Sequence, residues 1–429
     1  MMNRLQVYLD SSDFSLLSDP RRLNVELRKL RDQLQFYADQ SLVQFRFSMA
    51  HVCEAAPTGV HARESAQRRA EMMYRLCGSN TLVTIAEIIE AEALGVKGFL
   101  PFTNGRWYPS LGDLLPESPL ADMECAIDEA FKEQGLNRQQ RRQKKREVLG
   151  RRGLKGIAGK AVENSLPGTM SELLAVLPLE QSEIQVLVDF FRTGQGREQA
   201  MNACHRALAN PTFIMQRFAS DFDKLDGVTE WLRQGGIDFA EKLGSSTSAA
   251  QDLLRAFTLH DIAKEAEIEE IQNPVLKAER MSEFVAEKQT RQALVTNSWN
   301  KMQKSMLVDI CTRIAEKNGV SSAKDATTLL TQCPGISTAI AIFMYAAKRS
   351  ALPTESRTLS ASDFGDAMHG IYAPYVDIFR TDVFMADAVA KAVKLHGTKV
   401  ARRLSEVPSL IEQHLHSAVA VPSLVKKGL

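Results

Sequence analysis

The sequence predicts an α/β protein whose parallel sheet is formed from both ends of the chain, with a mostly α-helical insertion between them. A strand–helix–strand pattern occupies the first part of the chain, and strand character returns near the C-terminus. Between these two regions the strand signals nearly vanish. Strands that alternate with helices are typical of a parallel sheet flanked by helices.

The first predicted strand ends at a group of carboxylates. Residues 5–9 (LQVYL) are a short apolar run rich in β-forming residues, and Asp10 and Asp13 follow directly. Residues 22–38 carry apolar side chains at helical spacing, and residues 41–48 (SLVQFRFS) alternate as a second strand should. We therefore expect a β-α-β unit, as in a parallel sheet.

The middle of the chain is predicted to be helical. Apolar side chains recur at helical spacing in residues 182–192, 247–261 and 305–317, and residues 233–236 (RQGG) indicate a turn. We expect residues 61–334 to form an inserted helical region that selects a substrate or a protein partner. The two halves of the core would then be residues 1–60 and 335–429.

A second strand with a carboxylate after it is predicted near the C-terminus. Residues 360–373 have the pattern of a helix capped by Ser360 or Ser362. Residues 375–379 have the pattern of a short strand, and Asp382 follows it. In open parallel sheets, ligands lie beyond the carboxyl ends of the strands, so Asp10 and Asp382 could converge there. Clustered carboxylates repel one another unless a hard cation such as Mg²⁺ or Mn²⁺ holds them, and such a cation favours phosphodiester hydrolysis. Taken alone, each of these acids is more often a helix cap or a turn residue, since Asp is favoured at both.

Three segments resemble the PIN nuclease family. VYLDSSDFSLL is similar to the family's first strand, with Asp10 as the first acid, and FRFSMAHVCEAAP is similar to the second strand and the helix after it, with Glu54 as the second acid. SDFGDAMHGIYAPYVDIFRTD places Asp366 and Asp382 where the third and fourth acids lie. The resemblance covers residues 1–60 and 335–410.

The resemblance implies a PIN-like fold, a catalytic cluster that binds Mg²⁺ or Mn²⁺, and cleavage of RNA. The catalytic metal ligands would be Asp10, Glu54, Asp366 and Asp382, with metal-bound water as the attacking group. Asp13 and Asp363 are rival acids close to the matched ones. Because the insertion separates Glu54 from Asp366, Glu87 or Glu90 could take the place of Glu54.

A strongly basic run indicates contact with nucleic acid. Residues 138–160 contain ten Lys/Arg residues and a single acid, Glu147. This charge density is expected of a segment that binds phosphates, and we assign that role to Arg141, Arg142, Lys144 and Lys145. The run has no aromatic residue for base stacking, and its alternative role is a solvated helix face.

Two other nuclease or phosphohydrolase patterns occur in the helical region, and a third alternative is not catalytic. The doublet His260-Asp261 resembles that of HD phosphohydrolases, for which His205 and Asp309 would be further ligands. Arg255 and His260 have the spacing of the HEPN ribonucleases. The third alternative is an interaction protein whose PIN-like core has lost metal binding and whose helices form a scaffold.

Composition favours a cytoplasmic protein with no membrane partner. The chain has 429 residues, of which 44% are hydrophobic, and a formal net charge of +1. No apolar run reaches the roughly 18 residues that a transmembrane helix requires, and carboxylates lie where a signal peptide would be apolar. The six cysteines are scattered, which argues against a disulfide framework or a zinc site.

Overall fold

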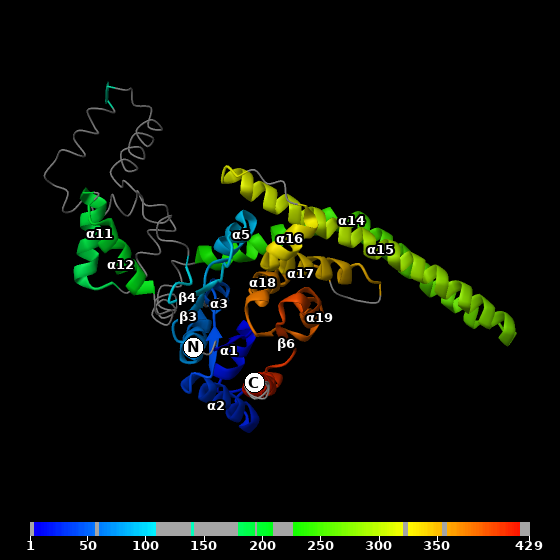
Figure 1. Ribbon diagram of the computed structural model, residues 1–429, viewed down its shortest axis with the longest axis horizontal. Helices are drawn as coiled ribbons and strands as arrows, with labels where there is room; N and C mark the ends of the chain where they lie inside the picture. The colour runs from blue at the N-terminus through cyan, green and yellow to red at the C-terminus, as the bar shows by residue number, and fades with distance from the viewer. Residues whose placement is uncertain are drawn as a thin grey trace, which may run out of the picture.

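The computed structural model describes residues 4–55, 60–108, 139–140, 179–193, 195–208, 226–320, 325–353 and 358–420. Its centre is a four-stranded, all-parallel sheet with the strand order β2-β1-β5-β6, flanked by helices (Figure 1). The strands are β1 (Leu5–Tyr8), β2 (Val43–Arg46), β5 (Ile378–Arg380) and β6 (Lys399–Ala401). The predicted α/β class, with a parallel sheet flanked by helices, is confirmed.

Strand β1 joins the two ends of the chain. It pairs with β2 in the register Leu5 to Val43, and with β5 in the register Val7 to Ile378. The sheet is therefore formed from strands near both termini. Successive side chains of β1 point to opposite faces, and both faces are covered by apolar residues, as is usual for parallel sheets.

The helices around the sheet form two apolar layers. Leu5 and Val7 pack with Phe14 in one buried cluster, whereas Tyr8 packs with Phe379 in another. The flanking helices are α1 (Ser11–Ser18), α2 (Val25–Asp39), α3 (Met49–Ala55), α18 (Ala361–Gly370), α19 (Val383–Ala392) and α20 (Val407–Ala420). Short 3₁₀ turns lie at Val60–Ala62, Ala373–Tyr375, Lys394–His396 and Leu404–Glu406.

The region after residue 60 continues the core. It contains α4 (Arg63–Cys77), β3 (Asn80–Leu82), α5 (Ile85–Leu94) and β4 (Phe102–Asn104). Strands β3 and β4 pair antiparallel, and Phe47 forms a parallel bridge to Thr81 beside β2. We did not expect strands here, because three residues are too few to show alternation in the sequence. Helix α4 packs on α1, so packing around the sheet passes the boundary that the sequence suggested at residue 60.

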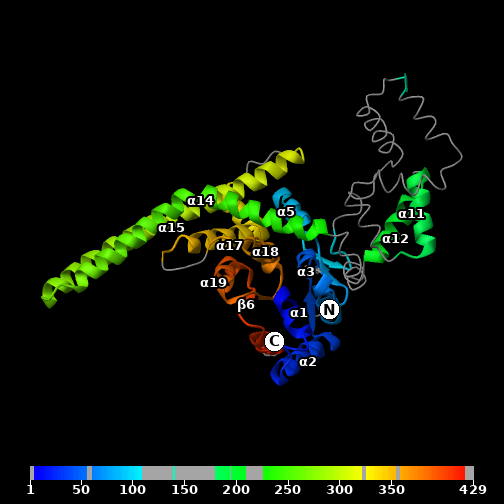
Figure 2. The ribbon, with the colours of Figure 1, turned by 180° about the vertical axis from the view of Figure 1, so that it is seen from behind.

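Two long antiparallel helices project from the core. They are α14 (Asp226–Glu269) and α15 (Pro274–Lys317), which run side by side away from the sheet in both views (Figures 1 and 2). The turn predicted at residues 233–236 is wrong, because these residues lie within α14. A glycine inside a helix costs only about 1 kcal/mol relative to alanine, which the rest of so long a helix can offset.

The remaining described helices are α11 (Gln181–Thr193), α12 (Arg197–Leu208), α16 (Ala326–Gln332) and α17 (Pro334–Ser350).

Helix α17 is fixed to α5 by a buried carboxylate. Glu92 accepts hydrogen bonds from the backbone N–H groups of Gly335 (2.6 Å) and Ile336 (2.9 Å). A Cβ atom at Gly335 would lie 2.8 Å from the carbonyl oxygen of Ile371, so this close approach requires glycine.

Within the described parts of the chain, no individual helix combines the length and the apolar character that a membrane crossing requires. Helices α16 and α17 satisfy that criterion only as a pair, and their axes are bent by 106° at the junction.

Candidate functional site

Two of the predicted acids lie where strands of the sheet end. Asp10 follows β1 and Asp382 follows β5, and we call this end of the sheet the carboxyl edge. Each acid also caps the helix that it precedes. Asp10 accepts from the N–H of Ser12 (2.7 Å), and Asp382 from the N–H of Met385 (2.7 Å). Each cap hydrogen bond uses one carboxylate oxygen and leaves the other available to a further partner.

Asp366, on α18, lies within electrostatic reach of both. Burial, and then the negative charges of Asp382 and Asp10, together raise the pKa of Asp366 to about 7. The carboxyl edge therefore collects three of the predicted acids, one from the N-terminal strand and two from the C-terminal elements.

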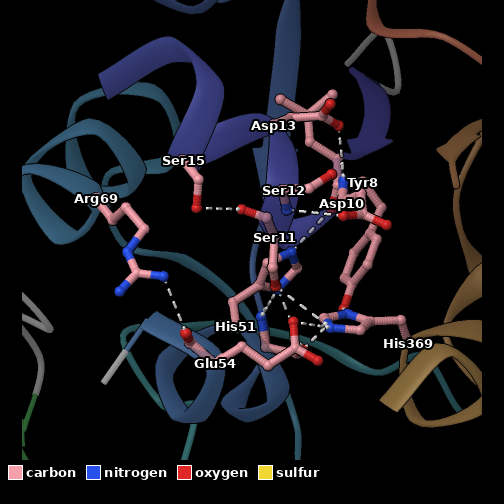
Figure 3. A network of polar contacts seen from close by, with 12 residues as sticks. Tyr8, Asp10, Ser11, Ser12, Asp13, Ser15, His51, Glu54, Arg69 and His369 are labelled. Carbon is pink, nitrogen blue, oxygen red and sulfur yellow. Dashed lines mark hydrogen bonds and ion pairs between the residues drawn. The ribbon is translucent and has the colours of Figure 1, made fainter. Parts of the chain in front are cut away.

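The fourth predicted acid, Glu54 on α3, pairs with a histidine that the sequence analysis did not single out. The Oε2 atom of Glu54 lies 3.1 Å from Nε2 of His369 on α18. The Nδ1 atom of the same ring lies 2.6 Å from the hydroxyl oxygen of Tyr8. Figure 3 shows Glu54 and His369 pointing toward each other, with Tyr8 on the other side of the ring. With its proton on Nε2, His369 donates to Glu54 and accepts from Tyr8.

Three of the four acids act on the charge of His369. Burial lowers the pKa of His369, but Glu54, Asp10 and Asp366 outweigh burial and leave this pKa above its usual value. Burial also raises the pKa of Glu54, yet the neighbouring His369 lowers it to about 2. Glu54 thus stays ionised at neutral pH.

A second buried histidine positions α3. His51 donates from Nε2 to the carbonyl oxygen of Leu9 (2.8 Å), and its Nδ1 accepts from the N–H of Ser48 (3.1 Å). Burial, and then the charge of His369, lower the pKa of His51 to about 3, so the ring is neutral. Because it bonds to the end of β1, His51 fixes α3 and with it Glu54 relative to the carboxyl edge (Figure 3).

The two rival acids are helix-capping residues. Asp13 accepts from the N–H of Asp10 (3.0 Å) and Asp363 from the N–H of Ser360 (2.8 Å), each as the third residue of a capping box. Burial raises the pKa of Asp13 to about 7 against the opposing effect of Arg380.

Arg380, at the end of β5, neutralises part of the carboxyl edge. Its guanidinium nitrogens lie 2.9 Å from Asp13 and 3.3 Å from Asp10. In the described residues no three His, Cys, Asp or Glu side chains are close enough together to coordinate one cation. As for the possible substitutes for Glu54, Glu87 caps α5 and pairs with Arg106, and Glu90 is exposed on the same helix.

The other residues that the sequence analysis singled out are not among the residues at the carboxyl edge. Arg141, Arg142, Lys144 and Lys145 lie outside the described residues. Asp261 of α14 pairs with Arg291 of α15 at 2.7 Å, which joins the two long helices. His260 is exposed on α14. The other candidates of the two alternative patterns have these contacts: Arg255 with Asp252, His205 with Tyr108, and Asp309 with Arg313.

The sequence analysis missed Tyr8, His51 and His369. A signal for the histidines was present, because His51 lies three residues before Glu54 and His369 three residues after Asp366. Residues three apart share one face of a helix, so each acid-bearing helix presents a histidine beside its acid.

Comparison with known proteins identified no relative: no protein-family model, no curated protein and no solved structure matches the chain.

Proposed function

We propose that this chain is a metal-dependent endoribonuclease of the PIN type, which hydrolyses phosphodiester bonds at the carboxyl edge. The observation that supports it best is the pKa of Asp366, which burial and the charges of Asp382 and Asp10 raise to about 7. Carboxylates that repel one another at the carboxyl end of a parallel sheet are suited to a cation.

The four acids supply the oxygen donors that a hard cation prefers, and to bind one they would have to move closer together than they lie in the described structure. Asp10, Glu54, Asp366 and Asp382 would hold Mg²⁺ or Mn²⁺, which prefer carboxylate oxygens, and Asp10 and Asp382 each keep an oxygen free of their cap bonds. When bound, the metal would supply an activated water and stabilise charge on the phosphate. His369 would hold Glu54 ionised and in place, and Arg380 would have to share Asp10 with the cation.

The rest of the chain would bind and select the substrate. We propose that Arg141, Arg142, Lys144 and Lys145 contact RNA phosphates, because ten basic residues with one acid give the charge density that such contacts require. The helical region would recognise the substrate or a protein partner.

A cleavage assay tests this proposal. The parent protein should cut RNA in Mn²⁺ or Mg²⁺ and lose activity in EDTA, and Asp366→Asn should reduce cleavage by at least about 100-fold in the metal. Asp363→Asn is the matched control, since it changes a capping acid of the same helix and should leave most of the activity. The proposal fails if no RNA is cut in either metal, or if both variants cut as fast as the parent.

A second candidate function is a non-catalytic interaction protein with a PIN-like core. It is favoured by the ion pairs of Arg380 with Asp10 and Asp13, and of His369 with Glu54, which neutralise acids without a metal. A melting temperature that does not respond to Mn²⁺ would support this candidate, because a ligand stabilises only the state that binds it.

A further inference from the structure

A cavity of about 330 Å³ lies between α15, α17 and α19. Its polar lining includes Asn300 and Gln303 from α15, Lys348 from α17 and Lys391 from α19. Trp299 and Tyr345 contribute aromatic surface, and short apolar side chains complete the wall. Among the described residues that line it, none is an Asp or a Glu.

The two lysines bring uncompensated positive charge to this cavity. Neither forms an ion pair with any residue in the described part of the chain. Partial burial, and then the like charge of Lys391, lower the pKa of Lys348.

A buried donor lies in the same wall. Trp299 is 6% exposed, and its indole N–H finds no acceptor among the described residues. A buried N–H without an acceptor destabilises the fold, and a bound oxygen atom would remove that cost. The lysines and the indole thus offer hydrogen-bond donors, while carboxylate acceptors are missing from the lining that the structure describes.

We propose that this cavity binds the phosphate groups of a small molecule, and that a nucleoside diphosphate or triphosphate is the class of ligand that fits it. Lysine ammonium groups bind phosphate oxygens as point charges, and the aromatic and apolar walls offer a surface to a base. The volume lies within the range of small-molecule sites, roughly 300–1,000 Å³. The site is separate from the four acids, and the inference does not depend on the nuclease proposal.

The cavity is also placed to communicate with the carboxyl edge. Helix α19 begins directly after Asp382 and carries Lys391 near its other end. Helix α17 carries Lys348 and packs against α18, which holds Asp366. A ligand held by both lysines would therefore contact two of the helices that position the acids.

Thermal unfolding of the full chain in EDTA tests the inference without involving a metal at the carboxyl edge. The probes are inorganic pyrophosphate, AMP, ADP and ATP at millimolar concentration. We expect pyrophosphate, ADP or ATP to raise the melting temperature. A larger shift with ADP or ATP than with pyrophosphate identifies a nucleotide as the ligand, and equal shifts identify the phosphate groups alone.

The variants Lys348→Gln and Lys391→Gln should each weaken binding by about tenfold or more, because each loses a charge-assisted hydrogen bond. Lys394→Gln is the matched control, since it removes the same charge from an exposed position that does not line the cavity. It should bind within about twofold of the parent. The inference is overturned if none of the four probes shifts the melting temperature, or if the shift survives in both cavity variants.

Discussion

The hydroxyl oxygen of Tyr8 lies 2.6 Å from Nδ1 of His369, although 361 positions of sequence separate the two residues. Tyr8 ends the first strand, and His369 lies on α18 beside Glu54 and the predicted acid Asp366. This contact fixes α18 to the centre of the sheet.

The pKa of His369 should depend on Glu54. In the parent it should lie above the usual value of 6.5, and Glu54→Gln should lower it, because the largest of the carboxylate effects that oppose burial is then lost while those of Asp10 and Asp366 remain. NMR titration of the His369 ring protons measures both values. Glu90→Gln removes an exposed acid on α5 and should leave the titration unchanged. An equal pKa in the parent and in Glu54→Gln would show that the pair does not form.

Asp366 should make the protein less stable as the pH rises. Its pKa is about 7 in the folded protein and near 3.8 when unfolded, so between these values the folded state holds a proton that the unfolded state has lost. The free energy of unfolding therefore falls as the pH rises from about 4 to about 7. Above about pH 7 the loss of stability reaches its full size, a few kcal/mol at most.

The variant Asp366→Asn isolates this effect from other titrating groups. The difference in the free energy of unfolding, variant minus parent, should increase from about pH 4 to about pH 7. Above about pH 7 this difference should stay constant. Urea unfolding at several pH values measures the difference. A difference that does not change with pH would mean that Asp366 titrates normally.

The cap and the proposed metal-binding role of Asp382 should be separable. Asparagine caps helices as well as aspartate does, so Asp382→Asn should keep its stability without metal, whereas Asp382→Ala should lose about 1 kcal/mol. Both variants should lose the rise in melting temperature that Mn²⁺ gives the parent. If Asp382→Asn kept that rise, Asp382 would be a cap and nothing more.

The basic run should bind phosphates without reading sequence. Replacing Arg141, Arg142, Lys144 and Lys145 with alanine should weaken binding to all single-stranded RNAs and reduce the salt slope by up to about 0.7 per lost contact. Binding isotherms at several salt concentrations give the slope for the parent and the variant. A slope that the four substitutions leave unchanged would remove this segment from the interface.

The long elements of the core were predictable because their patterns are local. The apolar run at residues 5–9 and the alternation at residues 41–48 predicted β1 and β2, and helical spacing predicted α2 and parts of α14 and α15. The strands β3 and β4 have three residues each, and their pairing depends on contacts with Phe47 and with each other. No local pattern carries that information.

The acids of the site were predictable as residues, but their partners were not. Asp10 and Asp382 follow strands, which is visible in the sequence, and the parallel sheet brings both to one edge. Arg380 directly precedes Thr381 and Asp382, but its ion pairs to Asp13 and Asp10 exist only because β5 pairs with β1. His369 likewise acquires its raised pKa partly from residues far away in the sequence, Glu54 on α3 and Asp10 at the start of α1.

The central claim is that acids from both ends of the chain hold one cation at the carboxyl edge. An anomalous difference map from crystals of the parent grown with Mn²⁺ tests it most directly. We expect a peak within coordination distance, about 2.0–2.3 Å, of oxygens from Asp10 and from Asp366 or Asp382. The same map from Asp366→Asn should show a weaker peak or none. A parent map with no peak at the carboxyl edge, and with Arg380 still paired to Asp10, would contradict the account.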